Sequence, residues 1–221
     1  VGRDLAAYLN QWWIRELQEQ YQVESRLEIE YETHYDRFVM PTIRGSDTGS
    51  KKRYAGLVSD ENGESTLIFK GLEAVRTDWT LVARNFQREL YRRVFQKQEF
   101  EQYLMELVES IRNGELDHEL IYRKRLRRRL EDYVRNIPPH VQAARKADEW
   151  LESQDLPARY ARGGWVRYVL TVNGPEPLEK VTSPLDYDLY IERQIEPIAD
   201  GILQFLNTSF SEIADQQLGL F

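Results

Sequence analysis

The sequence predicts an α+β protein: one helix and a small antiparallel sheet, followed by a mostly helical region. Up to about residue 70 the apolar residues recur first at helical spacing and then in alternation, whereas helical spacing dominates beyond residue 78. With 221 residues and 41% hydrophobic content, the chain is long enough to bury a sizeable core.

The first part of the chain changes its period after about 20 residues. One face of residues 2–20 is apolar at helical spacing, which predicts an amphipathic helix. In residues 27–34, apolar and polar side chains alternate, which predicts a half-buried strand. The apolar members of these two patterns are Leu5, Leu9, Trp12, Trp13 and Leu17 in the helix and Leu27, Ile29 and Tyr31 in the strand.

A hairpin completes the predicted sheet. The pair Asn62 and Gly63 is typical of a tight hairpin turn, and it separates a strand within residues 51–58 from a returning strand at 65–70. A break in pattern at residues 71–78 then predicts a domain boundary.

Helices dominate the rest. Asp78 is a candidate N-cap for helical stripes that continue to Asn113 and Gly114. Pro138 and Pro139 open a further helix to about residue 153. Residues 165–171 read as a strand, and residues 187–205 as a long helix that Pro197 should kink.

Composition excludes several kinds of site. The chain has no cysteine, hence no disulfide or thiolate metal site, and its three histidines lie far apart. No apolar run is long enough to span a bilayer and no signal peptide is evident, so we expect a cytoplasmic protein without a membrane partner. The chain starts at Val1, already in helical register, which suggests a piece of a longer protein.

Two basic segments are candidates for contact with a phosphate backbone, although the net charge is −7. The first has cations followed by an aromatic ring at the start of a strand, and such runs also commonly just solvate a strand edge. The second is a dense basic stretch, which alternatively forms a solvated face paired with carboxylates. Their candidate residues are Lys51, Lys52, Arg53 and Tyr54 in the first and Tyr122, Arg123, Lys124, Arg125, Arg127, Arg128 and Arg129 in the second.

Two further features keep two interpretations each. His140 lies at a predicted helix start, where it either helps to hold a phosphate or packs and caps the helix. Glu28, Glu30 and Glu32 share one predicted strand face, which is either solvated or stands near an active site. We find no nucleophile or base beside these glutamates that indicates a hydrolase.

Several motifs, in order along nearly the whole chain, resemble family-B DNA polymerases of bacteria. They begin with the alternating strand of residues 27–32 and the Lys-Lys-Arg-Tyr run that starts at Lys51. They continue with the segments 73–79, 122–126, 138–144, 173–177, 183–187 and 217–221.

The resemblance implies a division into late palm (1–74), thumb (75–214) and a clamp-binding tail (215–221). It assigns Lys51, Lys52 and Tyr54 to gripping the primer–template duplex near the 3′ end, and Glu32 matches a palm glutamate near the active site. The tail resembles a motif that docks into the bacterial sliding clamp, and the alternative is a tail folded on its own thumb. The residues of the motif are Gln217, Leu218, Leu220 and Phe221.

The same resemblance implies that the intact enzyme is a DNA-directed DNA polymerase using Mg²⁺ and deoxynucleoside triphosphates in repair or replication restart, near the nucleoid. The aspartate motifs that hold two metal ions in this family are missing from residues 1–221, so we expect no catalytic residue, no bound metal and no activity in the chain alone. The remainder of the polymerase would then be a partner. The alternative is a non-enzymatic helical adaptor that binds RNA or an acidic protein.

Overall fold

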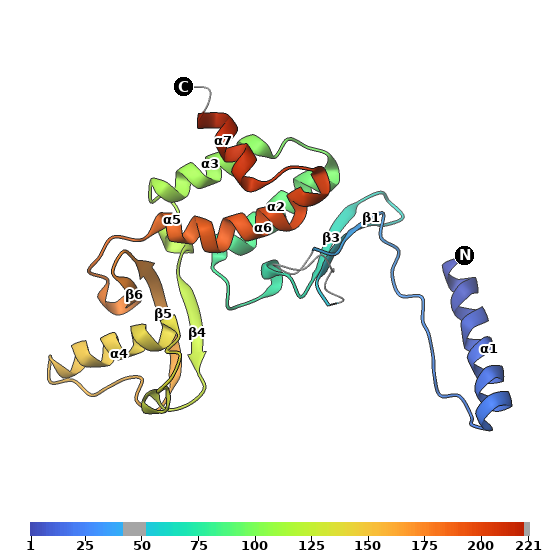
Figure 1. Cartoon of the computed structure of the whole chain (residues 1–221), viewed down its shortest axis with the longest axis horizontal. Helices are drawn as coiled ribbons and strands as arrows, with labels where there is room; N and C mark the ends of the chain where they lie inside the picture. The colour runs from blue at the N-terminus through green and yellow to red at the C-terminus, as the bar shows by residue number, and fades with distance from the viewer. Residues whose placement is uncertain (42–51, 219–221) are drawn as a thin grey trace.

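Two three-stranded antiparallel sheets lie on different sides of a group of packed helices (Figure 1). The computed structural model describes residues 1–41 and 52–218, the last three of them as backbone only. This combination of helices with small antiparallel sheets confirms the predicted α+β class.

Helix α1, Gly2–Tyr21, stands apart from the other elements (Figure 1). Its bounds confirm the predicted helix, but none of its residues is buried, and Leu5 is 54% exposed. Its apolar face is therefore only partly covered by the parts of the chain that the structure describes. Neither α1 nor another helix of this described region is apolar enough over a sufficient length to cross a membrane.

The strand predicted at residues 27–34 is wrong, because residues 22–35 contain no strand. A strand needs a neighbouring strand for its backbone hydrogen bonds, whereas the described backbone of residues 27–34 is hydrogen-bonded to the side chains of Asn10 and Ser25. The amide of Asn10 donates to the carbonyl of Ile29 over 2.9 Å and accepts from its N–H over 2.8 Å. The segment runs beside α1 with Leu27 and Glu28 both exposed, so its alternation produces no buried face.

The first sheet contains β1 (Arg37–Val39), β2 (Tyr54–Ser59) and β3 (Ser65–Lys70), in that order. The predicted hairpin between β2 and β3 is confirmed. The carboxylate of Asp60 accepts the N–H groups of Asn62 and Glu64, and Gly63 has a φ of 81° that a side chain would disfavour.

Helices α2 (Leu81–Gln96) and α3 (Glu101–Arg112) confirm the predicted apolar stripes. The predicted N-cap is wrong: Thr80, not Asp78, accepts the N–H of Ala83 at 3.4 Å. Asp78 instead receives two hydrogen bonds from Arg76, at 3.0 and 2.9 Å. Both residue types cap helices well, and the fork of Arg76 decides between them.

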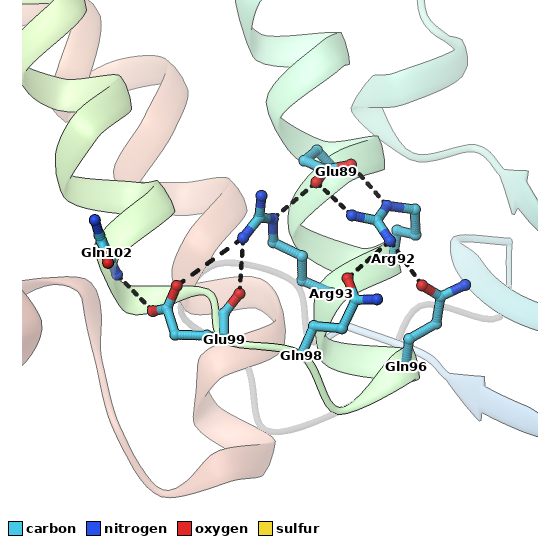
Figure 2. A network of polar contacts seen from close by, with 7 residues as sticks. All are labelled: Glu89, Arg92, Arg93, Gln96, Gln98, Glu99 and Gln102. Carbon is cyan, nitrogen blue, oxygen red and sulfur yellow. Dashed lines mark hydrogen bonds and ion pairs between the residues drawn. The ribbon is translucent and has the colours of Figure 1, made fainter.

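A polar network fixes the short connection between α2 and α3 (Figure 2). Glu89 accepts hydrogen bonds from Arg92 at 2.6 Å and Arg93 at 2.7 Å. Arg93 also donates to the carbonyl of Glu99 at 2.9 Å, and the Glu99 carboxylate accepts the N–H of Gln102 in the first turn of α3. One carboxylate thus anchors two arginines that reach across to the next helix.

The second sheet contains β4 (Tyr122–Leu126), β5 (Gly164–Thr171) and β6 (Gly174–Pro177), and helix α4 (Pro139–Glu152) packs against β5 and β6. The helix expected after Pro138 and the strand expected at residues 165–171 are both confirmed.

The last long helix is interrupted, as predicted, close to Pro197. It consists of α5 (Tyr187–Tyr190), a π-helical turn η5 (Ile191–Ile195) and α6 (Glu196–Leu203). Because proline has no N–H and its ring crowds the preceding turn, the regular ladder loosens there. Helix α7 (Phe210–Leu218) follows and buries Phe210 and Ile213 in a core that extends back to Val39.

Candidate nucleic-acid interface

On strand β4 the side chain of Tyr122 lies on one face and those of Arg123 and Arg125 lie on the other. Tyr122 points inward, with its ring centroid 5.0 Å from that of Tyr168 and 5.7 Å from that of Tyr190. Arg123 and Arg125 are exposed on the opposite face, as alternation along a strand requires. The packed tyrosines therefore hold two arginines outward.

The neighbouring strand β5 extends this basic face. Arg167 lies directly opposite Arg123 and Trp165 directly opposite Arg125. The guanidinium of Arg123 is 4.3 Å from the centroid of the Trp165 ring, which is 49% exposed. The residues Arg123, Arg125, Trp165 and Arg167 are called the cationic face below.

Like charges that stand opposite each other in a sheet are unfavourable, and the pair Arg123–Arg167 has no compensation from an acid. Among the residues that the structure describes, no carboxylate forms an ion pair with any arginine of the cationic face. Some arginines elsewhere in the basic and helical regions do have an acidic partner, for example Arg112 with Asp188 at 3.1 Å. The cationic face therefore carries three arginines whose charge is not compensated by an ion pair with a described carboxylate.

A cavity of about 460 Å³ continues this basic surface to the start of α4. His140 is 7% exposed in its wall and forms no hydrogen bond with the described residues. Burial, and then the nearby charge of Lys124, lowers the pKa of His140, so the imidazole is neutral at pH 7. The other residues of the wall are Thr77, Asp78, Arg123, Lys124, Arg125, Arg127, Tyr133 and Trp165.

The turn after β4 carries the remaining predicted cations. Arg127, Arg128 and Arg129 are exposed, and Arg129 forms an ion pair with Glu131 at 3.3 Å. The ring of Tyr133 supports this turn, because its hydroxyl accepts the N–H of Arg127 at 3.1 Å. The structure therefore gathers the second predicted basic group on one strand and its following turn.

The first basic group has a different arrangement. Lys51 lies outside the described residues, and Lys52 is exposed. Arg53 forms an ion pair with the buried carboxylate of Glu73. Tyr54 is half-buried, with its ring centroid 5.3 Å from that of Phe38.

The remaining predicted positions are scattered. Glu32 is exposed in the segment 22–35. The backbone of Gln217 and Leu218 belongs to the last turn of α7, whereas Leu220 and Phe221 lie outside the described residues.

Sequence reasoning missed Trp165 and Arg167. Their signal was present, because Trp165 and Arg167 alternate with the buried Val166 and Tyr168 in the predicted strand. Only the pairing of β5 with β4 shows that their exposed face joins Arg123 and Arg125.

Comparisons with known proteins agree on one family. A model of DNA polymerase family B matches residues 14–206. DNA polymerase II of Escherichia coli (strain K12) is 52% identical over 221 residues, which are 100% of this chain and 28% of that protein. A DNA polymerase of Methanocaldococcus jannaschii is 27% identical over 85% of this chain and 11% of its own length. One from Thermococcus litoralis is 29% identical over 80% of this chain and 10% of its own length.

The chain thus spans little more than a quarter of the length of the first of these relatives and about a tenth of the others. The resemblance inferred from the motifs, to bacterial family-B polymerases and in particular to DNA polymerase II, is confirmed by the family match and by the identity over the full chain.

Proposed function

The chain belongs to DNA polymerase family B, and from this premise we propose that it grips the primer–template duplex of a DNA-directed DNA polymerase. The supporting observation is the cationic face, whose arginines have no acidic partner among the described residues. A polymerase must hold any sequence, so contacts to phosphates without base recognition suit the task.

Lys52, together with Lys51 and Tyr54, is proposed as a second contact near the primer end. Lys52 is exposed directly before β2, where its ammonium is free to reach a phosphate. The turn cations Arg127, Arg128 and Arg129 and the buried edge of His140 would extend the contact along the backbone. The proposed late palm (1–74) and thumb (75–214) each contribute one basic group.

Nucleotidyl transfer is proposed for the whole polymerase and not for these residues. In the part of the chain that the structure describes, no three histidine, aspartate or glutamate side chains gather as a metal site. These residues therefore do not fit a two-metal centre, and we assign them no catalytic step. Mg²⁺ would be held by the remainder of the polymerase, against which the partly covered apolar face of α1 is suited to pack.

The tail, residues 215–221, is proposed to dock into the bacterial sliding clamp. A hydrophobic end segment that inserts side chains into a pocket gains binding energy, and even weak docking keeps a polymerase near its primer. A peptide of residues 210–221 should bind a purified bacterial clamp. The same peptide with Leu220→Ala and Phe221→Ala should not, and equal binding of both would exclude the motif.

By its family relation, the whole enzyme is proposed to act in DNA repair and replication restart, in the bacterial cytoplasm near the nucleoid. This assignment rests on the relation to DNA polymerase II and goes beyond the geometry of the chain.

Duplex binding is tested by fluorescence anisotropy of the 221-residue chain with a primer–template duplex over a salt series. Binding should weaken with salt, with a log–log slope of about −0.9 per neutralised phosphate. The double variants Lys51→Ala/Lys52→Ala and Arg123→Ala/Arg125→Ala should each bind more weakly and reduce the slope by up to about 2.

Arg112→Ala is the matched control, because Arg112 is paired with the exposed Asp188 away from the cationic face. Equal affinity of the double variants and the wild type would contradict the proposal. Preference for single-stranded RNA over duplex DNA would favour the alternative of an RNA-binding adaptor.

A further inference from the structure

Two residues predicted to contact DNA direct their functional groups into the protein. Arg53 pairs with a carboxylate that is buried, and the hydroxyl of Tyr122 accepts a hydrogen bond from the amide of Gln194. Arg53 directly precedes β2 and Tyr122 is the first residue of β4, and these strands belong to the two different sheets. Each adjoins side chains that are proposed to contact the duplex.

The Arg53 link passes through two buried side chains. Glu73, in the 3₁₀ turn η1 (Glu73–Val75), is 7% exposed, and Gln87 of α2 is 1% exposed. One oxygen of Glu73 accepts from Arg53, and the other accepts from the Gln87 amide at 2.8 Å. The Gln87 oxygen accepts the N–H of Ala74 at 2.6 Å. Both carboxylate oxygens and the amide are thus occupied.

Backbone packing makes this link a rigid one. Gly71 has a φ of 64°, and a Cβ added there would lie 2.3 Å from the carbonyl oxygen of Lys52. The chain at Lys52 is therefore pressed against Gly71 while Arg53 is held by Glu73. These two constraints fix the backbone from which the Lys52 side chain projects.

The Tyr122 link reaches the same helix from the other sheet. Gln194 is 5% exposed in the π-helical turn η5, and its amide donates to the hydroxyl of Tyr122. Its oxygen accepts from the hydroxyl of Thr80, which is fully buried and is the N-cap of α2. Buried polar groups that are hydrogen-bonded to one another in this way favour one arrangement of the elements they join.

Both links end on α2, at Thr80 and at Gln87, two helical turns or about 10 Å apart along the axis. We infer that Arg53 and Tyr122 are positioning residues that fix β2 and β4 on α2, so that Lys52 and the cationic face meet one duplex at a set spacing. This inference rests on the proposed duplex grip for its purpose, but the spacing itself can be measured without DNA.

The spacing is measured by electron–electron double resonance between two nitroxide labels. Because the chain has no cysteine, Thr66→Cys on β3 and Arg167→Cys on β5 give specific attachment at two exposed strand positions. We expect one narrow distance distribution in this doubly labelled chain. Adding Arg53→Gln or Tyr122→Phe should broaden it or add a second peak, at temperatures where far-ultraviolet circular dichroism shows the variant folded.

Two matched controls and one conservative variant make the result specific. Arg112→Gln and Tyr187→Phe remove exposed interactions with Asp188 and Asp117, and should leave the distribution unchanged. Arg53→Lys keeps the charge beside Glu73 and should restore most of the narrow distribution. If Arg53→Gln does not fold, Gln87→Glu replaces it in the same measurement. If Tyr122→Phe does not fold, Gln194→Glu replaces it. If the variants of either link give the same label–label distance distribution as the doubly labelled chain without them, the inference is overturned.

Duplex binding separates the inference from the proposed function. Arg53→Gln should weaken duplex binding by about tenfold and leave the salt slope unchanged. If Arg53 itself contacted a phosphate, its loss would lower the slope by about 0.9. A lowered slope for Arg53→Gln would overturn its role as a positioning residue. If the wild-type chain binds no duplex while the label distances respond as expected, the proposed function fails and the positioning role stands.

Discussion

At the scale of single residues, the cationic face contains a pair of like charges that lowers the stability of the free protein. Arg123 and Arg167 face each other across two strands with no acidic partner among the described residues. A pair of this kind costs a few tenths of a kcal/mol, and an anion beside it would offset that cost. Such an arrangement in a protein of net charge −7 supports the proposal that this face binds an anion.

We predict that Arg167→Gln makes the free protein more stable and a poorer DNA binder. The free energy of unfolding should rise by about 0.5 kcal/mol because the like-charge pair is removed. The salt slope of duplex binding should become shallower by about 0.9 because one phosphate contact is lost. Urea denaturation and fluorescence anisotropy measure the two effects.

The control for this variant is Arg112→Gln, which removes an arginine that does have an acidic partner, Asp188. It should lower stability slightly or not at all and leave DNA binding unchanged. If Arg167→Gln lowers the free energy of unfolding or leaves DNA binding unchanged, the prediction that Arg167 favours binding at the expense of stability is contradicted.

His140 should make duplex binding depend on pH. Burial and the charge of Lys124 lower its pKa in the free protein, and a phosphate beside it would raise that pKa again. DNA binding then takes up a proton, so affinity should increase as the pH falls from 8 to 6. In His140→Gln this increase should be smaller, as measured by anisotropy at constant ionic strength.

The same histidine has the opposite effect on the stability of the free protein. Its lowered pKa means that the unfolded chain binds the proton more tightly, so stability should fall as the pH falls below about 6.5. His118→Gln serves as the control, since the His118 side chain is 74% exposed. If the affinity of the wild-type chain for the duplex does not change between pH 8 and 6, His140 does not belong to the DNA interface.

At the scale of elements, the connection between α2 and α3 depends on one carboxylate (Figure 2). The hydrogen bonds from Arg92, opposed by burial and supported by Arg93, lower the pKa of Glu89 to about 2. Glu89→Gln should therefore reduce the free energy of unfolding by about 1 kcal/mol at pH 7, a value limited by the partial exposure of the carboxylate.

The pH dependence of the stability difference between wild type and Glu89→Gln follows from the direction in which the pKa of Glu89 is shifted. A lowered carboxyl pKa gives stability that is present above the ordinary value near 4.5 and is lost as the pH falls toward 2. The melting temperatures of wild type and Glu89→Gln should accordingly converge between pH 4.5 and 2. Glu109→Gln, an exposed change on α3, should show no such convergence.

Elements with local signals could be predicted from the sequence, and elements that depend on distant partners could not. The hairpin at Gly63 and the helix after Pro138 follow from turn and cap chemistry within a few residues. The strand expected at residues 27–34 failed because its pattern met no neighbouring strand. The cap expected at Asp78 was wrong because α2 begins after Thr80, and the Asp78 carboxylate is hydrogen-bonded to Arg76 instead.

At the scale of the whole molecule, the site could be predicted in part. The basic residues of β4 were evident as a run, but Arg167 and Trp165 joined them only through the strand pairing. The inward roles of Arg53 and Tyr122 depend on Glu73 and Gln194, which lie 20 and 72 residues away in sequence. The sequence showed which basic and aromatic residues could contact an anion. Which of them face outward depends on strand pairing and on hydrogen bonds between residues far apart in the sequence.

The overall arrangement also separates a folded body from its N-terminal part (Figure 1). Helix α1 has no buried residue, and no described hydrogen bond or ion pair joins residues 1–33 to residues 52–218. The contacts of this part that the structure records, such as Asn10 with Ile29, are internal. The core begins near Tyr35, whose ring lies against Gly56 of β2.

Removal of residues 1–33 should therefore leave the stability and the DNA binding of the remaining chain unchanged. We expect a melting temperature within about 2 °C of that of the full chain, because a loss of about 1 kcal/mol would already shift a domain of this size by about 2–4 °C. The salt slope of duplex binding should be the same, since the cationic face and Lys52 are retained. Tyr35→Ala in the full chain is the contrasting variant and should lower the melting temperature, because it empties the space against Gly56. A large destabilisation on truncation, by contrast, would mean that α1 packs on the body in solution.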